Sequence, residues 1–255
     1  MTELEHGLRN LLTAGKRIFV PYVTGGLPGV DADLLGGVER IGADVIEVGL
    51  PFSDPVMDGP VIQEASRRAL EAGTTPESVL DLVKSADLTT PTVVMTYLNP
   101  VLATGVDRFL DLAADAGIHG VIVPDLPVDE GAEWAAACAS REIASVFLAA
   151  PGTSKERLRD VAAASRGFVY CVSTFGVTGE RDRLAGTAQE LVGALREVTS
   201  RPLVVGVGIG TPDAASKACT FADGVVVGTA LVRPLLEGDP EAMIELAKDF
   251  RDAVR

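Results

Sequence analysis

Eight short runs rich in valine and isoleucine, separated by longer amphipathic segments, constrain the fold of this chain more than any other feature. The runs are 18–24, 44–50, 91–97, 119–124, 143–149, 167–173, 202–208 and 223–228. They are almost continuously apolar, which is typical of parallel strands buried on both faces. Eight such repeats in 255 residues favour an α/β fold of the closed (β/α)8 TIM-barrel type over an open doubly wound sheet.

The segments between these runs have helical periodicity. We expect helices over 31–41, 61–72, 77–86, 106–116, 130–140, 155–164, 188–198 and 240–254. Ser154, followed by Lys155-Glu156-Arg157, has the sequence of a helix start. Residues 4–14 are expected to form an extra N-terminal helix that covers the barrel floor. No linker or low-complexity tract interrupts the chain, so residues 1–255 are expected to be a single domain.

Charge and cysteine content narrow the partners and the compartment. A net charge of −14 argues against binding to nucleic acid or to an anionic membrane surface. It does not exclude a small phosphorylated ligand, because backbone N–H groups can bind phosphate without Lys or Arg. Three scattered cysteines, the absence of a signal-peptide pattern at the start and the lack of a long apolar run together predict a cytoplasmic protein.

The most informative single residue is Glu47, in the apolar run Val45-Ile46-Glu47-Val48-Gly49. A carboxylate inside an apolar strand is rarely buried without a partner. If its side of the strand is the barrel interior, the carboxyl group points into the mouth, and burial raises its pKa into the range useful for acid–base catalysis. The alternative is a structural Glu paired with an Arg.

The loop 51–60 follows that strand and carries two more carboxylates. Active sites of such barrels are built from the strand ends and the loops that follow them. Asp58 is therefore a second catalytic candidate, although it could equally be an N-cap for a helix with Pro60 in its first turn. Asp54, before Pro55, could simply shape the turn.

Glycines after the last two strands predict a phosphate site. Gly208 follows the seventh strand, and Gly228 with Thr229 follows the eighth and opens a helix. Barrels of this class often bind phosphate at these loops and at a helix N-terminus. Tight turns are the alternative explanation for the glycines. The loop 174–181 has the composition of a mobile lid or of a passive surface loop, and Tyr170, just before it, either lines the pocket or packs in the core.

Residue types that are missing limit the chemistry. None of the five lysines lies at the C-terminal end of an expected strand, which argues against a Schiff base. With two histidines and no Cys–His pairing in view, a catalytic metal or a cysteine nucleophile is not expected. Carboxylates, hydroxyls and backbone dipoles remain, so we expect proton transfers on a phosphorylated substrate and no cofactor or metal.

The sequence resembles the tryptophan synthase alpha subunits along nearly its whole length. The motifs that carry the resemblance are 46–55 with 58–63, 21–26, 95–100, 123–127, 176–179, 206–209 and 228–230. The stretch from Glu47 to Gln63 is specific to that family, whereas the glycine motifs occur in many phosphate-binding barrels. The resemblance implies retro-aldol cleavage of indole-3-glycerol phosphate to indole and glyceraldehyde 3-phosphate.

By the same resemblance, Glu47 and Asp58 match the two catalytic carboxylates of the family. Asp58 would accept or stabilise the indole N–H, while Glu47 would protonate the ring carbon and later deprotonate the side-chain hydroxyl. Tyr170 matches a tyrosine in the substrate pocket, and Phe19 and Tyr22 are further candidates for the indole pocket.

The remaining matches concern the phosphate and the lid. Gly179, Gly208, Gly228 and Thr229 match phosphate-binding positions, and Thr178 matches a lid threonine that orients the Asp. Thr229 stands where many members carry Ser, which keeps the hydroxyl. Some members carry an Arg in the lid, and the residues 173–175 of this sequence include none, so the resemblance extends to the chemistry more fully than to lid closure.

The family also implies a partner, a pyridoxal-phosphate beta subunit in an αββα assembly, with loop 51–60 and segment 97–104 as candidate contacts. Three alternatives stay open at this point. One is another phosphate-binding barrel enzyme, another is a non-catalytic chain that binds indole compounds or activates a beta subunit, and the third is a stand-alone indole-releasing lyase.

Overall fold

The strands of the computed structural model close into a parallel barrel. The structure describes residues 1–172, 181–206 and 208–255, and for residues 181–186 it describes the backbone alone. The described strands are β1 Ile18–Thr24, β2 Ile46–Gly49, β3 Thr92–Met95, β4 Ile118–Ile122, β5 Ala144–Val146, β6 Leu148–Ala149, β7 Val169–Val172, β8 Leu203–Gly206 and β9 Gly224–Val227. They are hydrogen-bonded in the order β5-β4-β3-β2-β1-β9-β8-β7-β6. Since β5 and β6 are consecutive in the chain, this order returns on itself.

The fifth barrel strand is interrupted at Phe147, which explains nine described strands where the sequence predicts eight. The amide of Phe147 donates to the Ser165 hydroxyl at 3.3 Å, and its carbonyl accepts from Tyr170 at 3.1 Å. The break therefore separates the part that pairs with β4 from the part that pairs with β7. The (β/α)8 TIM barrel is confirmed.

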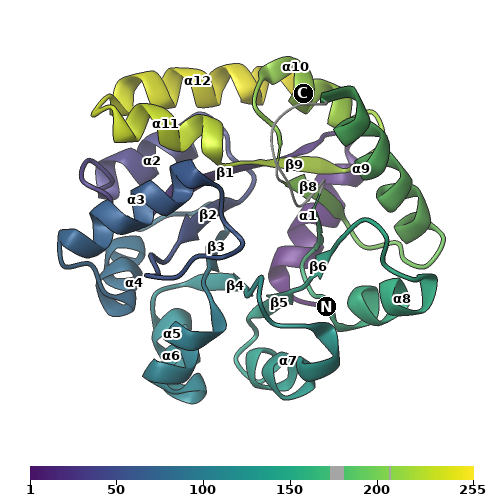
Figure 1. Ribbon diagram of the computed structural model, residues 1–255, viewed down its shortest axis with the longest axis horizontal. Coiled ribbons are helices and arrows are strands. Elements are labelled where there is room, and N and C mark those ends of the chain that lie inside the picture. Colours follow the sequence, from purple (N-terminus) through teal and green to yellow (C-terminus); the bar gives the residue numbers. More distant parts are fainter. Residues whose placement is uncertain (173–180, 207) are drawn as a thin grey trace.

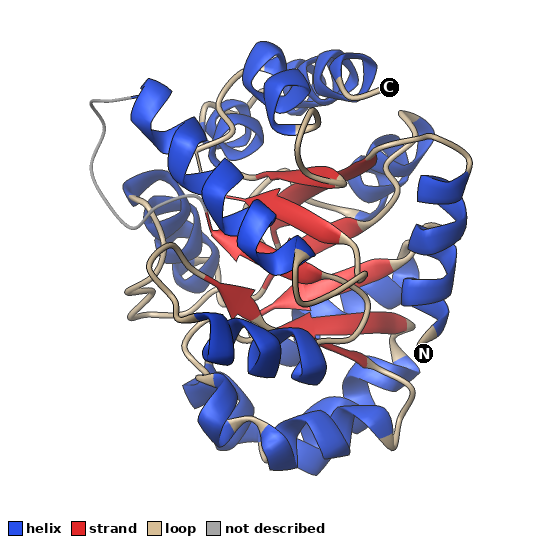
Figure 2. Ribbon diagram, turned by 90° about the vertical axis from the view of Figure 1, so that its right-hand side faces the viewer, coloured by secondary structure: helices blue, strands red, loops and turns tan. Residues whose placement is uncertain are grey.

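Helices surround the barrel on the outside (Figures 1 and 2). They are α1 Glu3–Thr13, α2 Ala32–Arg40, α3 Pro60–Glu71, α4 Pro76–Ser85, α5 Leu98–Thr104, α6 Val106–Asp115, α7 Ala132–Ala139, α8 Lys155–Ala164, α9 Arg181–Arg196, α10 Pro212–Ala218, α11 Thr229–Leu236 and α12 Pro240–Ala253. Among the described helices, none has the length and apolar character needed to cross a membrane.

Several local expectations are confirmed and others need correction. Ser154 caps α8 by accepting from the Arg157 amide at 3.3 Å. The helix α9 begins at Arg181 and not at 188. The early start was missed because the residues 181–187 are mostly polar or small and form no apolar stripe. No helix was expected over α5 or α10, although Thr211 caps α10 and is followed by Pro212 at the first helical position.

The extra helix α1 lies across the floor of the barrel, as expected. Leu4 and Glu5 are buried on it. A side chain at Gly167, just before β7, would meet Leu4 at 2.8 Å. Arg201, just before β8, forms an ion pair with Glu5 at 2.5 Å. Because these contacts gather at the N-terminal ends of the strands, the opposite end remains for the functional residues.

Candidate functional site

Glu47 faces the barrel interior. It pairs in register with Tyr22 of β1, and two residues on, a Cβ placed at Gly49 would meet the Tyr22 hydroxyl at 2.0 Å. Strand alternation therefore puts the side chains of Glu47 and Tyr22 on the same inner face. The Glu47 side chain is 1% exposed, and its Oε2 has no hydrogen-bond partner in the described part of the chain. No described Arg forms an ion pair with it, so the alternative of a structural Glu–Arg pair is not supported.

The electrostatic state of Glu47 follows from that burial. Loss of hydration disfavours the charged form, and the neighbouring charge of Asp58 adds to this effect, which together raise the pKa of Glu47 to about 8. At neutral pH the carboxyl group is therefore mainly protonated. A protonated acid in a dry barrel mouth can donate a proton and, once ionised, take one back.

Asp58 lies on the loop between β2 and α3, and it is not the cap of that helix. The helix α3 begins at Pro60 with Gly59 as N-cap, and no side chain caps it. The Asp58 carboxylate instead accepts a hydrogen bond from the Tyr97 hydroxyl at 3.1 Å. The Gln63 side chain donates to the Asp58 backbone carbonyl at 3.0 Å and helps to fix the loop. The N-cap interpretation of Asp58 is therefore wrong.

Two opposing effects set the ionisation of Asp58. Burial raises its pKa to about 6, while the hydrogen bond from Tyr97 lowers it. Asp58 is thus mainly ionised at neutral pH where Glu47 is mainly protonated. Such a split between two neighbouring carboxyl groups is typical of paired acid–base sites. Asp54, in contrast, is exposed and accepts from the Ser53 hydroxyl at 2.6 Å, which fits a turn-shaping role.

Tyr22 and Tyr170 bring two aromatic rings to the same mouth. Each leans over a glycine of the next strand: a Cβ at Gly49 would meet the Tyr22 hydroxyl, and one at Gly206 would meet the Tyr170 hydroxyl at 2.1 Å. Burial raises the pKa of both phenols well above its ordinary value, and the charges of Glu47 and Asp58 contribute to both shifts. These shared charges show that both rings lie near the two carboxyl groups.

Phe19 does not join this group. It is fully buried on β1, three residues before Tyr22. Because successive side chains of a strand alternate, its ring lies on the face opposite to Tyr22, toward the helical shell. Of the two rings considered for an indole pocket, only Tyr22 is in the barrel mouth.

The glycines after the last two strands lie at the same end of the barrel. Gly228 is the N-cap residue of α11, without a side-chain cap, and Thr229 is the first residue of that helix. The first amides of a helix lack helical acceptors, so they are available to an anion. A Cβ at Gly228 would contact the Tyr22 ring at 3.6 Å, which places this helix start beside the mouth. Gly208 is exposed, with a φ of 85° that favours glycine.

Part of the expected site cannot be placed. Thr178 and Gly179, with most of the loop 174–181, lie outside the described residues. Within the described residues, no group of His, Cys, Asp and Glu side chains could hold a metal ion. The three cysteines are buried and form no disulfide, and none of them is hydrogen-bonded to a histidine in the described part of the chain.

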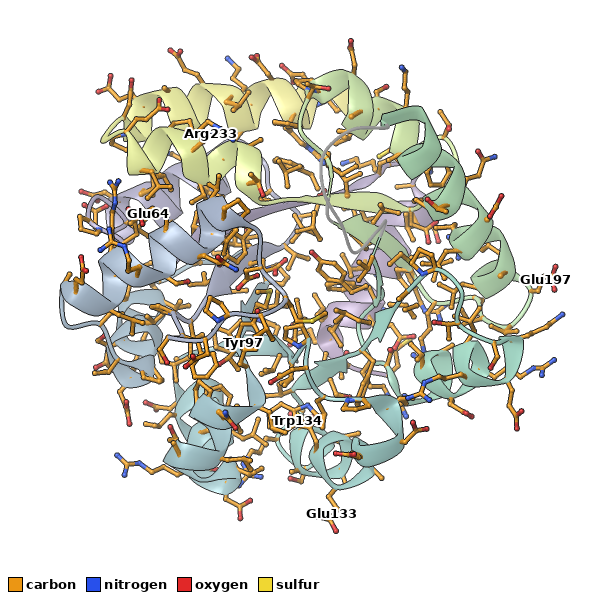
Figure 3. The ribbon with its side chains drawn as sticks, viewed as in Figure 1. Glu64, Tyr97, Glu133, Trp134, Glu197 and Arg233 are labelled. Atoms are coloured by element: carbon orange, nitrogen blue, oxygen red, sulfur yellow. The ribbon has the colours of Figure 1, made fainter. Side chains whose placement is uncertain are left out.

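Tyr97 is the main residue whose contact with the candidate site was not expected from the sequence, where it belonged only to the segment 97–104 expected to contact a partner. It lies just after β3, inside the ring of helices, whereas Glu133 and Glu197 point outward (Figure 3). Its hydroxyl contacts Asp58 as described. The signal was available: a tyrosine directly follows the strand next to the one that bears Glu47, and strand ends of neighbouring strands meet at one edge.

The chain is similar to proteins of one kind along nearly its full length. The family model "Tryptophan synthase alpha chain" matches residues 8–253. A relative of that name in Gloeobacter violaceus is 44% identical over 237 residues, covering 91% of this chain and 86% of that protein. Another in Thermobifida fusca is 43% identical over 257 residues, covering 98% and 95%.

Solved structures agree with these relatives. A structure of Mycobacterium tuberculosis tryptophan synthase superimposes with a TM-score of 0.91 at 39% identity, covering 100% of this chain and 98% of that chain. A structure of tryptophan synthase subunit alpha from Legionella pneumophila gives a TM-score of 0.91 at 33% identity, with 100% and 98% covered.

Proposed function

Because this chain belongs to the family of tryptophan synthase alpha chains, an enzyme family of tryptophan biosynthesis, we propose that it cleaves indole-3-glycerol phosphate to indole and glyceraldehyde 3-phosphate. The observation that carries the proposal is the pair of carboxyl groups in the barrel mouth. Glu47 is buried and protonated near neutral pH, and Asp58 beside it is ionised, because their pKa values are about 8 and about 6.

The two carboxyl groups have the states that a retro-aldol cleavage requires. Asp58 accepts the proton of the indole N–H, the ring double bond shifts to lie between nitrogen and C2, and Glu47 protonates C3, the ring carbon that bears the side chain, giving an indolenine. The Glu47 carboxylate then takes the proton from the side-chain hydroxyl. The carbon–carbon bond breaks, its electrons return to the ring, and the aldehyde leaves. Asp58 finally returns its proton to nitrogen. The heteroaromatic ring holds the electrons, so the proposed steps use neither a lysine nor a metal.

The anionic end of the substrate is proposed to bind at the backbone of Gly208, Gly228 and Thr229, together with Gly179. The proposal is supported by the uncapped start of α11 beside the Tyr22 ring. Tyr22 and Tyr170 are proposed to enclose the indole ring, and Thr178 to orient Asp58. A crystal soaked with a substrate analogue tests this arrangement, and a phosphate found away from Gly208 and Gly228 contradicts it.

A beta subunit is the proposed partner, in an αββα assembly. Three of the large apolar side chains exposed in the described chain lie on the two segments expected to form the contact: Val56 is 77%, Met57 36% and Leu102 56% exposed. Exposed apolar side chains gathered on one face are typical of protein interfaces. Measuring indole release with and without a beta subunit separates a complexed enzyme, whose rate rises strongly, from a stand-alone lyase.

Substitution of each carboxyl group tests the chemistry. Glu47→Gln and Asp58→Asn are each expected to lower the rate of indole release at least about 100-fold, since a positioned acid or base contributes that much or more. Glu133→Gln, on the exposed outer face of α7, is the matched control and should release indole at the native rate. Near-normal turnover by Glu47→Gln would remove the acid–base assignment and favour a non-catalytic binding protein.

A further inference from the structure

Tyr97 reaches Asp58 from a different strand end than the loop that carries Asp58. It follows β3 and is the N-cap residue of α5, whereas Asp58 follows β2. We propose that Tyr97 is a positioning residue that fixes the Asp58 carboxylate, and the loop that bears it, in the orientation needed to accept the indole proton. The expected change in turnover rests on the proposed function, whereas the hydrogen bond from Tyr97 to Asp58 does not depend on it.

One hydroxyl makes two bonds to that loop. It accepts from the Met57 backbone amide at 2.9 Å and donates to Asp58 Oδ2 at 3.1 Å. Because the amide can only donate, it occupies an acceptor site of the hydroxyl and leaves its proton for Asp58. The direction of both bonds is therefore fixed by chemistry. The Tyr97 ring also packs on Phe52 of the same loop, with ring centroids 5.3 Å apart.

No other side chain in the described part of the chain replaces the Tyr97 bond. Gln63 holds the Asp58 backbone carbonyl, not the carboxylate, so it restrains the loop without orienting the acid. Within the described residues, Tyr97 is the only group bonded to the carboxylate oxygens of Asp58. Removal of its hydroxyl would leave that carboxylate without a hydrogen bond from the described residues, and a misplaced carboxylate is costly for a proton transfer.

The hydroxyl also favours the reactive charge state. The groups that face Asp58 are Glu47 on β2, Tyr22 on β1 and Tyr170 on β7, and none donates a hydrogen bond to it. Burial raises the pKa of Asp58, and the Tyr97 bond is the influence that lowers it. The Tyr97 phenol itself stays protonated, because burial and the charge of Asp58 raise its pKa, with a smaller contribution from Asp125 after β4.

The test is Tyr97→Phe, which keeps the ring and its contact with Phe52 but removes the hydroxyl. We expect kcat for indole release to fall by about 10- to 100-fold, the range for losing a hydrogen bond to a charged group. We also expect the low-pH limb of the kcat/KM profile to move to higher pH, because Asp58 then needs less acid to become protonated. A merely structural role would lower the amount of active protein without moving that limb.

Tyr22→Phe is the matched control for the limb. The Tyr22 hydroxyl, which this variant lacks, lies in the same barrel mouth and accepts a hydrogen bond from Thr24, but it makes none to Asp58. Whatever it does to substrate affinity, it should leave the low-pH limb in place. A Tyr97→Phe limb that coincides with the native limb overturns the proposal, as does a limb that moves equally in both variants.

A second readout is independent of turnover. In protein labelled with 13C at the aspartate carboxyl carbons, the Asp58 resonance is identified by its loss in Asp58→Asn and titrated by NMR. Tyr97→Phe should raise the Asp58 titration midpoint, and an unchanged midpoint overturns the proposal. If the native chain has no lyase activity, the proposed function is wrong, but the NMR titration of Asp58 still tests the role of Tyr97. Loss of the fold in Tyr97→Phe would identify a structural role instead and would also overturn it.

Discussion

Replacement of Glu47 by Gln should change how the stability of the protein depends on pH, whatever its substrate is. Glu47 has a pKa of about 8 in the folded chain, against an ordinary value of 4.5. Between these values the unfolded chain ionises this group while the folded chain keeps it protonated. The folded state thus binds more protons, so stability falls as pH rises from about 4.5 and levels off above about 8.

The size of this effect follows from the gap of about 3.5 pH units. At about 1.4 kcal/mol per unit, the full loss is about 5 kcal/mol, and about 3 kcal/mol of it falls between about pH 5.5 and 8. For a chain of this size, 1 kcal/mol moves the melting temperature by about 2–4 °C. The native protein should therefore lose about 6–12 °C over that interval through this one group.

The assay is a series of thermal melts of the native chain and of Glu47→Gln across that pH interval. The neutral amide cannot ionise, so the variant should lack this part of the slope and become relatively more stable as pH rises. A buried amide without a hydrogen-bond partner lowers the stability of the variant by about 1–3 kcal/mol at every pH. The diagnostic quantity is therefore the slope of stability against pH, and not the constant difference between the two proteins. Glu133→Gln, an exposed change on α7, should run parallel to the native curve. Parallel curves for Glu47→Gln and the native chain would refute the buried, uncharged state of Glu47.

Two further outcomes follow from the same geometry. The kcat/KM profile for indole release should be bell-shaped, falling below about pH 6 as Asp58 protonates and above about pH 8 as Glu47 ionises. A flat profile from about pH 5 to about pH 9, measured in a single buffer series, would contradict this expectation. Gly49→Ala should push on the Tyr22 hydroxyl, 2.0 Å from the new Cβ, and cost about 1–3 kcal/mol of stability with loss of activity. The control Gly193→Ala, with no atom within 4 Å in α9, should instead stabilise by about 0.5–1 kcal/mol in a denaturant titration.

Much of the fold was readable in the sequence because its signals are local. A buried parallel strand needs a continuous apolar run, and a helix needs a stripe at its own period, so the eight repeats and the leading helix followed from the order of residues. The break at Phe147 did not, because it depends on the Ser165 hydroxyl and on the pairing of Tyr170, which are distant in sequence.

The sequence by itself identified Glu47 as an anomaly and Asp58 as a polar residue at a strand end, but it left each with two explanations. Only the tertiary structure decided between them, because the choice depends on what surrounds each carboxyl group. Burial without a partner gives Glu47 its raised pKa, whereas Asp58 lies before the N-cap Gly59 and its carboxylate accepts from the Tyr97 hydroxyl, which follows another strand. The spacing of Phe19 and Tyr22 already puts them on opposite faces of one strand, because side chains alternate along it. Only the closed barrel decides which of these faces is the interior, and it is the face of Tyr22 and Glu47.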